Sequence, residues 1–534
     1  MRRRPLQIFS LLYWMAVVGL FALAAWQRFS LPLDPIADPD TWSYLAPALQ
    51  KLTGSDFVHQ GRNFIYPGFL FCLLRLFGDF RAITVAQHLL GLAAGGLLLM
   101  TWRRAYAVLK APRLKPWRHN ALGLGAAAIF LLAGDPIRTE MQIRPEGVCA
   151  FFLSLNLWFV VQFIVGTFVE KKPFSPRLGV GVVLTALLLA SLKPSFIFLA
   201  AISLVPVGVS FLRPGFSSQK SWLAGSAAAG ALLILLPEYL LSRHDDFARV
   251  FLPTTLFVIH ADIIRDQMAD DLKLGAEIPY SREWLSRVQA ELTEEITKSA
   301  VPGSEYYPSL GFSPDHLMYR EASIASRLDQ DLQSDTAALT GFYRFYYWRT
   351  WRHRPLAMAK KVVRQMALFY APLCPAYDPS KVMLLTDKYR LGVASLNSYA
   401  YPGVWQKYRP AVEFMSRTDS LAHDAPSIAQ PKVLRRALSF LARAYLPLLF
   451  VTLVLAVAAF FHLGRPLGWL AALTLFVFSY NAAACFEVAI IHSLEVVRYT
   501  LVQIYFTLLA ECLALWLLVE SLFQKRERPG ISGV

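Results

Sequence analysis

Residues 147–168 read GVCAFFLSLNLWFVVQFIVGTF, a run that contains no Asp, Glu, Lys or Arg. About 20 consecutive apolar residues are enough for a helix to cross the roughly 30 Å of hydrocarbon in a bilayer. The run therefore predicts a membrane-spanning helix. Further runs on either side raise the prediction to about ten spans: 8–28, 82–101, 119–134, 178–193, 195–212, 221–241, 440–462, 467–489 and 500–522.

The composition agrees with a membrane protein. Of 534 residues, 55% are hydrophobic and only 17% are charged, and the mean hydropathy is +0.41. So few charges cannot cover a water-soluble monomer of this size, and the 37 Phe, 22 Tyr and 13 Trp exclude a disordered chain. The fold class predicted from the sequence is an all-α polytopic membrane protein, in which we find no internal repeat.

The net charge of +16 reflects topology. Cytoplasmic loops of membrane proteins are enriched in Lys and Arg, and a cytoplasmic N-terminus places all of the basic loops on one side. We read the first run as a retained span, because no small-residue cleavage site follows it. The residues predicted to be cytoplasmic are Arg2, Arg3, Arg4, Arg103, Arg104, Lys110, Arg113, Lys115, Arg118, Lys171, Lys172, Arg177, Lys525, Arg526 and Arg528.

This orientation divides the chain into three parts. Residues 1–241 form an N-terminal membrane module with a first outer loop at 29–81, residues 242–438 form a mostly helical outer segment, and residues 439–534 form a C-terminal membrane module. Shorter outer segments are expected at 134–146 and 490–499, and turns at Pro302-Gly303 and Pro402-Gly403. Five cysteines give no disulfide framework and no zinc spacing, and no nucleotide-binding glycine loop is present.

Carboxylates are concentrated in the first outer loop. Asp34, Asp38 and Asp40 follow the first span, and Asp40 lies at the expected start of a helix that carries Tyr44. Helix capping is the simpler interpretation of Asp40, because Asp is among the commonest N-cap residues. The alternative is a functional role, because carboxylates at a membrane surface or cavity are costly and usually have a task.

The order of these motifs resembles the GT-C superfamily of membrane glycosyltransferases. The P-D-x-x-x-Y-x-x-x-A pattern at 39–48, followed by Tyr66-Pro67-Gly68-Phe69, is similar to the first periplasmic loop of the aminoarabinose transferases and protein O-mannosyltransferases. The resemblance implies a GT-C-like fold, a sugar donor linked to polyprenyl phosphate, and Asp40 as the catalytic base. Family members often place a second acid directly after this aspartate; this chain has Thr41 there, and Asp38 is the candidate substitute.

Other outer residues complete the predicted site. Glu146 matches an acid that the family places before the next span, although capping of the helix after Pro145 is an equal alternative. Lys193 suits a lipid phosphate, with snorkelling to the interface as the alternative. The candidates are Asp38 and Glu146 for acceptor orientation or a metal; Arg62, Lys193, Lys360, Arg364 and Arg498 for the donor phosphate; Tyr44, Tyr66, Glu495 and Tyr499 for the substrate cavity; and Asp40 with Glu146 for a divalent cation, Mg or Mn.

Residues 355–370 predict an amphipathic interfacial helix. Leu356, Ala359, Val363, Met366 and Tyr370 recur at helical spacing, and Lys360, Lys361 and Arg364 lie on another face. The helix follows an aromatic and arginine-rich stretch at 342–354, for which we discard nucleic-acid binding because the segment lies outside the cytoplasm. We expect the basic face to contact the lipid carrier, with headgroup anchoring as the alternative.

Three other functions are compatible with the sequence. A polysaccharide polymerase or O-antigen ligase also uses polyprenyl-linked sugars, and the arginines at 344–354 favour it. A transporter or flippase of lipid-linked sugars predicts repeats and charges in the middle of spans, whereas we expect the acids to lie in loops. A scaffold without chemistry leaves the outer carboxylates unexplained. The predicted location is a bacterial inner membrane with the active site on its periplasmic face, and the predicted partners are the donor lipid, membrane lipids and an unidentified acceptor.

Overall fold

The structure is a computed structural model that describes residues 3–57, 61–172, 175–212, 218–243, 245–301, 306–398, 406–461 and 467–523. The turns predicted at Pro302-Gly303 and Pro402-Gly403 lie outside the described residues. The same holds for Arg2 and for the basic C-terminal residues Lys525, Arg526 and Arg528.

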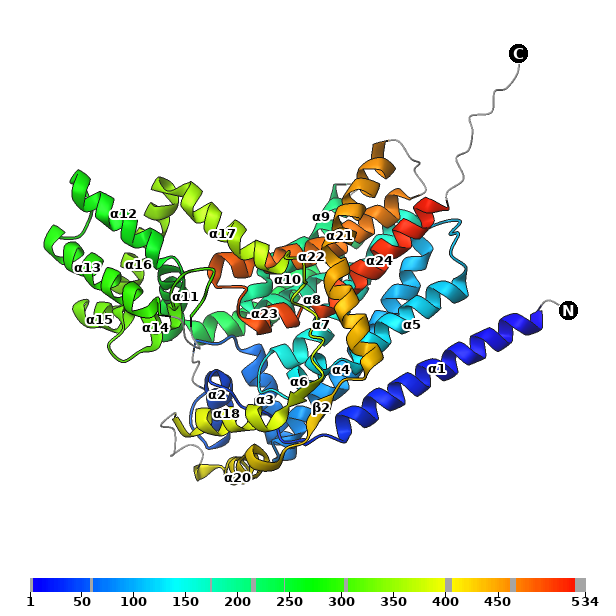
Figure 1. The fold of residues 1–534 in the computed structure, drawn as a ribbon, viewed down its shortest axis with the longest axis horizontal. Helices are drawn as coiled ribbons and strands as arrows, with labels where there is room; N and C mark the ends of the chain where they lie inside the picture. Colours follow the sequence, from blue (N-terminus) through cyan, green and yellow to red (C-terminus); the bar gives the residue numbers. More distant parts are fainter. Residues whose placement is uncertain are drawn as a thin grey trace, which may run out of the picture.

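Each of the ten apolar runs forms a helix (Figure 1). In the described part of the chain, eight helices are long and apolar enough to cross a membrane, or nine if the bent pair α5 (Pro116–Leu132) and α6 (Gly134–Glu140) counts as one span. α8 (Pro176–Leu192) is apolar but shorter. The eight are α1 (Arg3–Phe29), α4 (Arg81–Ala105), α7 (Glu146–Ile164, extended by a π-helical turn at Val165–Val169), α9 (Ile197–Phe211, preceded by a 3-10 turn at Pro194–Phe196), α10 (Ser218–Ser242), α21 (Lys432–Phe461), α22 (Gly468–Ile491) and α24 (Ile504–Leu522).

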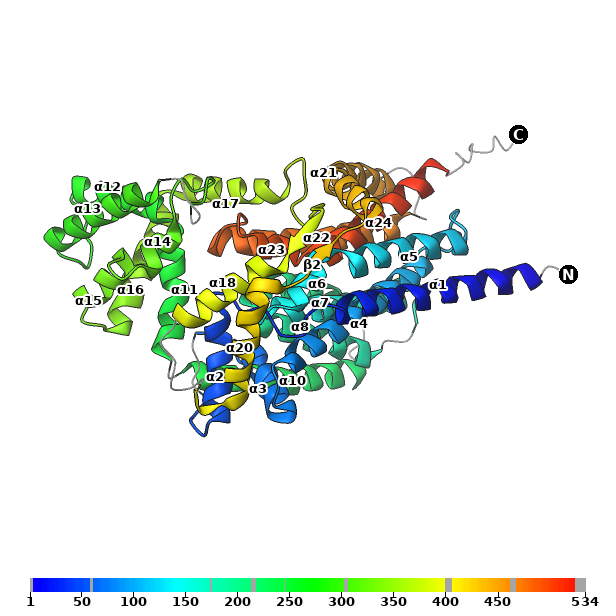
Figure 2. The same cartoon turned by 60° about the horizontal axis from the view of Figure 1, so that its bottom comes forward.

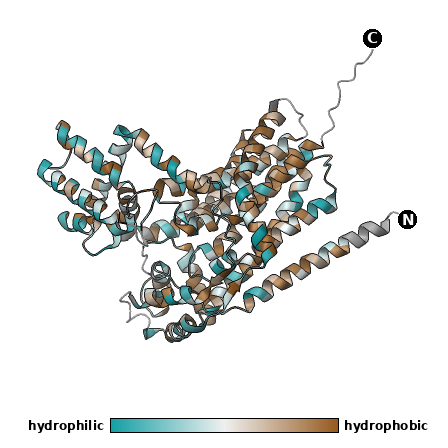
Figure 3. Cartoon of the chain, viewed as in Figure 1, coloured by the Kyte–Doolittle hydropathy of each residue, from teal (hydrophilic) through white to brown (hydrophobic). Residues whose placement is uncertain are grey.

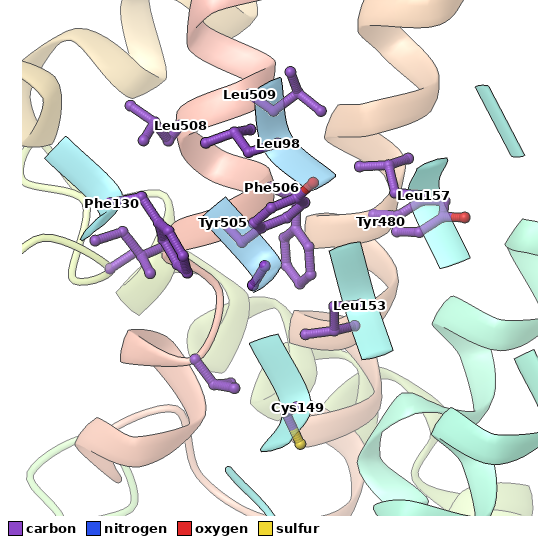
Figure 4. Packing of buried hydrophobic residues seen from close by; sticks show 14 of the residues in the cluster. Leu98, Phe130, Cys149, Leu153, Leu157, Tyr480, Tyr505, Phe506, Leu508 and Leu509 are labelled. Carbon is purple, nitrogen blue, oxygen red and sulfur yellow. The ribbon is translucent and has the colours of Figure 1, made fainter. Parts of the chain in front are cut away.

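The core of the bundle surrounds α24. In its most apolar stretch 72% of the residues are buried, whereas only 6% are buried in the corresponding stretch of α1. The first helix, α1, therefore lies at the periphery. Figure 4 shows Tyr505 and Phe506 of α24 among leucines of α4 and α7 and beside Tyr480 of α22. Tyr505 also meets Phe130 of α5 edge to face, with 5.8 Å between ring centroids. The last span is therefore a central helix, which packs on α21, α22 and α5 and touches α4 and α7.

The expectation that the acids lie in loops is wrong for four glutamates, because Glu238 lies in α10 and three more lie in α22 and α24. Glu487 of α22 accepts a hydrogen bond from the backbone N–H of Phe198 (2.9 Å), and Glu511 of α24 accepts one from the Tyr377 hydroxyl (2.5 Å). Glu520, near the other end of α24, accepts backbone N–H groups of the loop before α5. Each buried carboxylate holds a neighbouring segment in place, which offsets the cost of burying it.

The predicted outer segment divides into parts with different partners. Helices α11 to α16 surround their own apolar core and form a polar lobe at one end of the bundle (Figures 1 to 3). α17 (Pro355–Phe369) follows and packs on α22. The lobe contains α11 (Asp246–Val258), α12 (Ala261–Leu274), α13 (Arg282–Ser299), α14 (Pro314–Tyr319), α15 (Ile324–Asp331) and α16 (Thr336–His353).

The chain then returns to the first outer loop. That loop contains α2 (Thr41–Leu52) and α3 (Ile65–Phe77); the returning segment contains α18 (Leu385–Ser398), α20 (Arg409–Asp424) and an antiparallel pair, β1 (Val382–Leu384) with β2 (Ser427–Ala429). Arg417 of α20 donates to Asp34 (2.6 Å) and Asp79 (3.0 Å), and the Tyr389 hydroxyl donates to the Asp34 carbonyl. The returning segment therefore holds the loop that carries Asp40.

Candidate functional site

One cavity of about 400 Å³ lies where several of the predicted outer segments meet. The first outer loop contributes Asp40 and Arg62, the loop before α7 contributes Arg144 and Glu146, and the turn before α9 contributes Lys193. Residues of α11 and α14 line it from the lobe, and the segment 491–499, which includes the start of α23 (Val497–Leu501), closes another side. Seven of the residues predicted for the site line this cavity: Asp40, Tyr44, Arg62, Glu146, Lys193, Arg498 and Tyr499.

Asp40 is surrounded by arginines. It stands at the N-cap position of α2, but its side chain makes no capping hydrogen bond. Its Oδ1 accepts from Arg62 (3.0 Å), and its Oδ2 accepts from Arg144 (2.9 Å) and Arg498 (2.7 Å). These guanidinium groups outweigh the cost of burial and hold the pKa of Asp40 well below its usual range. The carboxylate is therefore an anchor for three cations rather than a cap.

Asp38 makes a hydrogen bond just ahead of α2, where the sequence predicted a role for Asp40. Its Oδ1 accepts the backbone N–H of Asp40 (2.9 Å), just before α2 begins. Its other oxygen pairs with Arg144. Burial raises the pKa of Asp38 and the Arg144 guanidinium opposes that rise. Asp38 does not line the cavity, so it supports the site through Arg144 and the helix start.

Glu146 and Lys193 form a buried ion pair. The Lys193 Nζ donates to Glu146 Oε1 at 2.7 Å, and both side chains are about nine-tenths buried. The same Nζ lies 4.6 Å from the centre of the Tyr499 ring. Lys193 does not snorkel to the interface, and Glu146 binds a cation rather than a helix N-terminus.

The charges that line the cavity balance. The lining contains four cationic side chains and four carboxylates. Two of the carboxylates, Asp40 and Glu146, are described above, and the other two are Glu238 and Asp315. Glu238 accepts the backbone N–H of Phe64 (2.5 Å), and Asp315 accepts the Tyr307 hydroxyl (2.9 Å). An incoming anion therefore has to share guanidinium groups that already bind Asp40. A phosphate is suited to this, because arginine forks bind its oxygens bidentately.

Several predicted residues lie elsewhere. Tyr66 is buried beneath the site, edge to face with Tyr44, and donates to Gln87 (3.0 Å). Glu495, predicted for the substrate cavity, accepts from the backbone N–H and hydroxyl of Ser309 and does not line the cavity. Lys360 and Arg364 are exposed on α17 and do not line the cavity. Among the residues that the structure describes, no group of three His, Cys, Asp or Glu is arranged to hold a metal.

Sequence reasoning missed Arg144 and His492. Arg144 lies two residues before Glu146 in the same predicted outer loop. Its position beside a candidate acid is the sequence feature that could have identified it as a site residue. Burial, with Arg498 adding to it, lowers the pKa of His492 to about 3, so this cavity residue is neutral at physiological pH. Tyr319 and Phe251 also line the cavity, and no local pattern distinguishes them from ordinary residues of the lobe.

Comparison with known proteins adds no assignment. No protein-family model matches the chain, and no curated protein sequence matches it.

Proposed function

We propose that the protein is a membrane glycosyltransferase of the GT-C type that moves a sugar from a polyprenyl-phosphate carrier to an acceptor, with inversion. The observation that carries the proposal is the Asp40 carboxylate bound by three arginines in a cavity that also holds the Glu146–Lys193 pair. The proposed site lies on the periplasmic side of a bacterial inner membrane. Its end of the bundle is opposite the end where α4 finishes and α5 begins, which carries the basic loop at 103–118 (Figure 1).

The proposed reaction needs both signs of charge. An acceptor oxygen or nitrogen attacks the anomeric carbon, the bond from that carbon to the phosphate oxygen breaks, and the polyprenyl phosphate leaves with the bonding electrons. Arg498, Arg144 and Arg62 stabilise the negative charge that develops on the leaving phosphate, and Lys193 also lines the cavity. Asp40 takes the proton from the acceptor.

The arginines make Asp40 a weak base until the donor binds. A carboxylate whose pKa is held low accepts a proton poorly. A donor phosphate that shares Arg498 and Arg144 draws positive charge away from Asp40, and the pKa of the carboxylate rises toward its ordinary value. Donor binding thereby activates the base in this proposal.

The arginine-rich stretch gives little support to the ligase alternative. Arg349 donates to Asp271 (2.7 and 2.8 Å) and Arg354 donates to Asp270 (2.5 Å), so these arginines join helices within the lobe. Glutamates within membrane spans are a feature of transporters. Here, however, Glu487 and Glu511 accept hydrogen bonds from neighbouring segments of the protein. Neither observation favours a second function over glycosyl transfer.

The test uses the full-length protein in lipid nanodiscs. It is incubated with a panel of polyprenyl-phosphate pentoses and hexoses, and the release of polyprenyl phosphate is measured with a membrane extract as the acceptor source. We expect one donor to be consumed by the wild-type protein and not by the Asp40→Asn variant. If every donor stays intact, and farnesyl phosphate does not bind the protein, the proposal is wrong.

A further inference from the structure

The turn between α22 and α23 is held by α17. α22 ends at Ile491, so its last carbonyl groups lack partners within the helix. The Lys361 Nζ donates to one of these carbonyl oxygens, that of Ala489 (2.7 Å), and to the carbonyl oxygen of His492 (3.1 Å), the residue that follows the helix. Burial lowers the pKa of Lys361 to about 7, and its amine can donate hydrogen bonds in both protonation states. Lys361 is buried, so it does not share the exposed face of Lys360.

Gln365, one helical turn further along α17, holds the next part of the turn. Its Oε1 accepts from the Ser493 hydroxyl (3.0 Å) and the Leu494 backbone N–H (2.9 Å). Its Nε2 donates to the Ser309 hydroxyl (2.5 Å), and Ser309 in turn donates to Glu495 from its backbone N–H (2.9 Å) and its hydroxyl (2.6 Å). Gln365 is fully buried. Polar groups of residues 489–495 are thus satisfied by α17 and the lobe.

The same turn determines where Arg498 lies. Arg498 follows Glu495 by three residues and reaches Asp40 at 2.7 Å. A guanidinium fork binds an anion well only in a fixed geometry, and a displacement of about 1 Å at a reacting centre can reduce a rate about 100-fold. Hydrogen bonds thus link α17 to residues 489–494, and the backbone from there leads within a few residues to Arg498 in the cavity.

We infer that Lys361 and Gln365 are positioning residues, which act through the turn at 492–496 to place the Arg498 guanidinium against Asp40 and the donor phosphate. The inference rests on the proposed function only in naming that phosphate. The opposite side of α17 exposes Leu356, Lys360 and Val363. The helix that we expect at the membrane surface is thus also the one that positions a cation of the site.

A distance measurement tests the inference without ligand or turnover. Spin labels are placed at the exposed positions Lys51 and Val497 in a Cys72→Ser background, because Cys72 is also exposed. We expect one narrow distance distribution in the otherwise wild-type protein in nanodiscs. Lys361→Met and Gln365→Leu should each broaden or shift it, because both remove the donors or acceptors that hold the turn. The matched control Lys360→Met should leave it unchanged.

A binding cycle tests whether the effect passes through Arg498. Lys361→Met should weaken farnesyl phosphate binding several-fold, and should cause no further loss in an Arg498→Ala background. An equal loss in both backgrounds, or an unchanged distance distribution in both α17 variants, overturns the inference. Lys361→Met and Gln365→Leu are judged separately, so if one variant misfolds, the other still tests the inference. If the wild-type protein does not bind farnesyl phosphate, the proposed function fails, and the distance measurement still decides the positioning role.

Discussion

The substitution Asp40→Asn separates the proposed base from an ordinary structural carboxylate. Asn keeps the shape of the side chain and removes its negative charge and its capacity to accept a proton. Arg62, Arg144 and Arg498 remain in the cavity without the anion that they share. The variant should therefore affect the chemical step and the binding of the donor phosphate in opposite directions.

The expected magnitudes follow from exposure and charge. Loss of a general base slows a reaction by about 10² to 10⁴-fold. The side chains of Asp40 and Arg498 are 25% and 31% exposed, so solvent screens their interaction and we discount it to about 1 kcal/mol. A phosphate no longer has to compete for that interaction, and about 1 kcal/mol corresponds to roughly fivefold tighter binding.

Two measurements in nanodiscs check this prediction: the Kd of farnesyl phosphate by calorimetry, and the rate of a single turnover with the donor that the panel identifies. Asp56→Asn is the matched control, because Asp56 is an exposed carboxylate of the same loop that does not line the cavity. It should leave both quantities unchanged. If Asp40→Asn weakens phosphate binding as much as it slows transfer, Asp40 organises the site and is not its base.

Three further perturbations have defined outcomes. Glu146→Gln leaves the buried Lys193 ammonium without its carboxylate and should destabilise the protein by about 3 kcal/mol, seen as a lower Tm, while a Glu146→Gln, Lys193→Met double variant should recover part of the loss. A cysteine placed in the basic loop 102–118 should resist an impermeant thiol reagent in intact cells, and one at the exposed Ala290 should react; the reverse pattern contradicts the topology. Lys360→Gln should raise the donor KM about fivefold in anionic vesicles with little change in kcat, because a surface cation contributes about 1 kcal/mol; a fall in kcat alone contradicts a lipid contact.

The membrane helices were predictable because length and apolarity suffice to define a span. All ten runs are helical, but hydropathy does not show which helix is central, since the mean hydropathy is 1.6 for α24 and 1.5 for α1. α5 and α6 illustrate a second limit, since the segment 134–146 that we expected to be an outer loop begins with a helix, α6, which lies at 51° to α5. How deeply a helix is buried depends on which other helices pack around it, and the hydropathy of one segment does not reveal those neighbours.

The sequence identified many of the charged residues of the site, but it did not show which of them form ion pairs with one another. Asp40 has the sequence context of a cap, yet its neighbour Asp38 holds the helix start, and only the fold brings Arg144 and Arg498 to Asp40 from 104 and 458 residues away. Helical periodicity placed Lys361 with Lys360 on one basic face. Adjacent residues on a helix point about 100° apart, and here that rotation separates an exposed lysine from one buried against α22.

The arginines around Asp40 lead to a prediction about pH. The base must be ionised to act, and its pKa in the donor complex depends on how much positive charge remains beside it. Transfer at saturating donor should therefore rise with pH and reach a plateau once Asp40 is ionised. Arg498→Gln removes one guanidinium from the carboxylate, which raises the pKa of Asp40 in the donor complex, so the rising limb should move to higher pH while the plateau falls. If that limb stays at the same pH in the Arg498→Gln variant, the group that limits the rate at low pH does not face Arg498, and Asp40 is not the base.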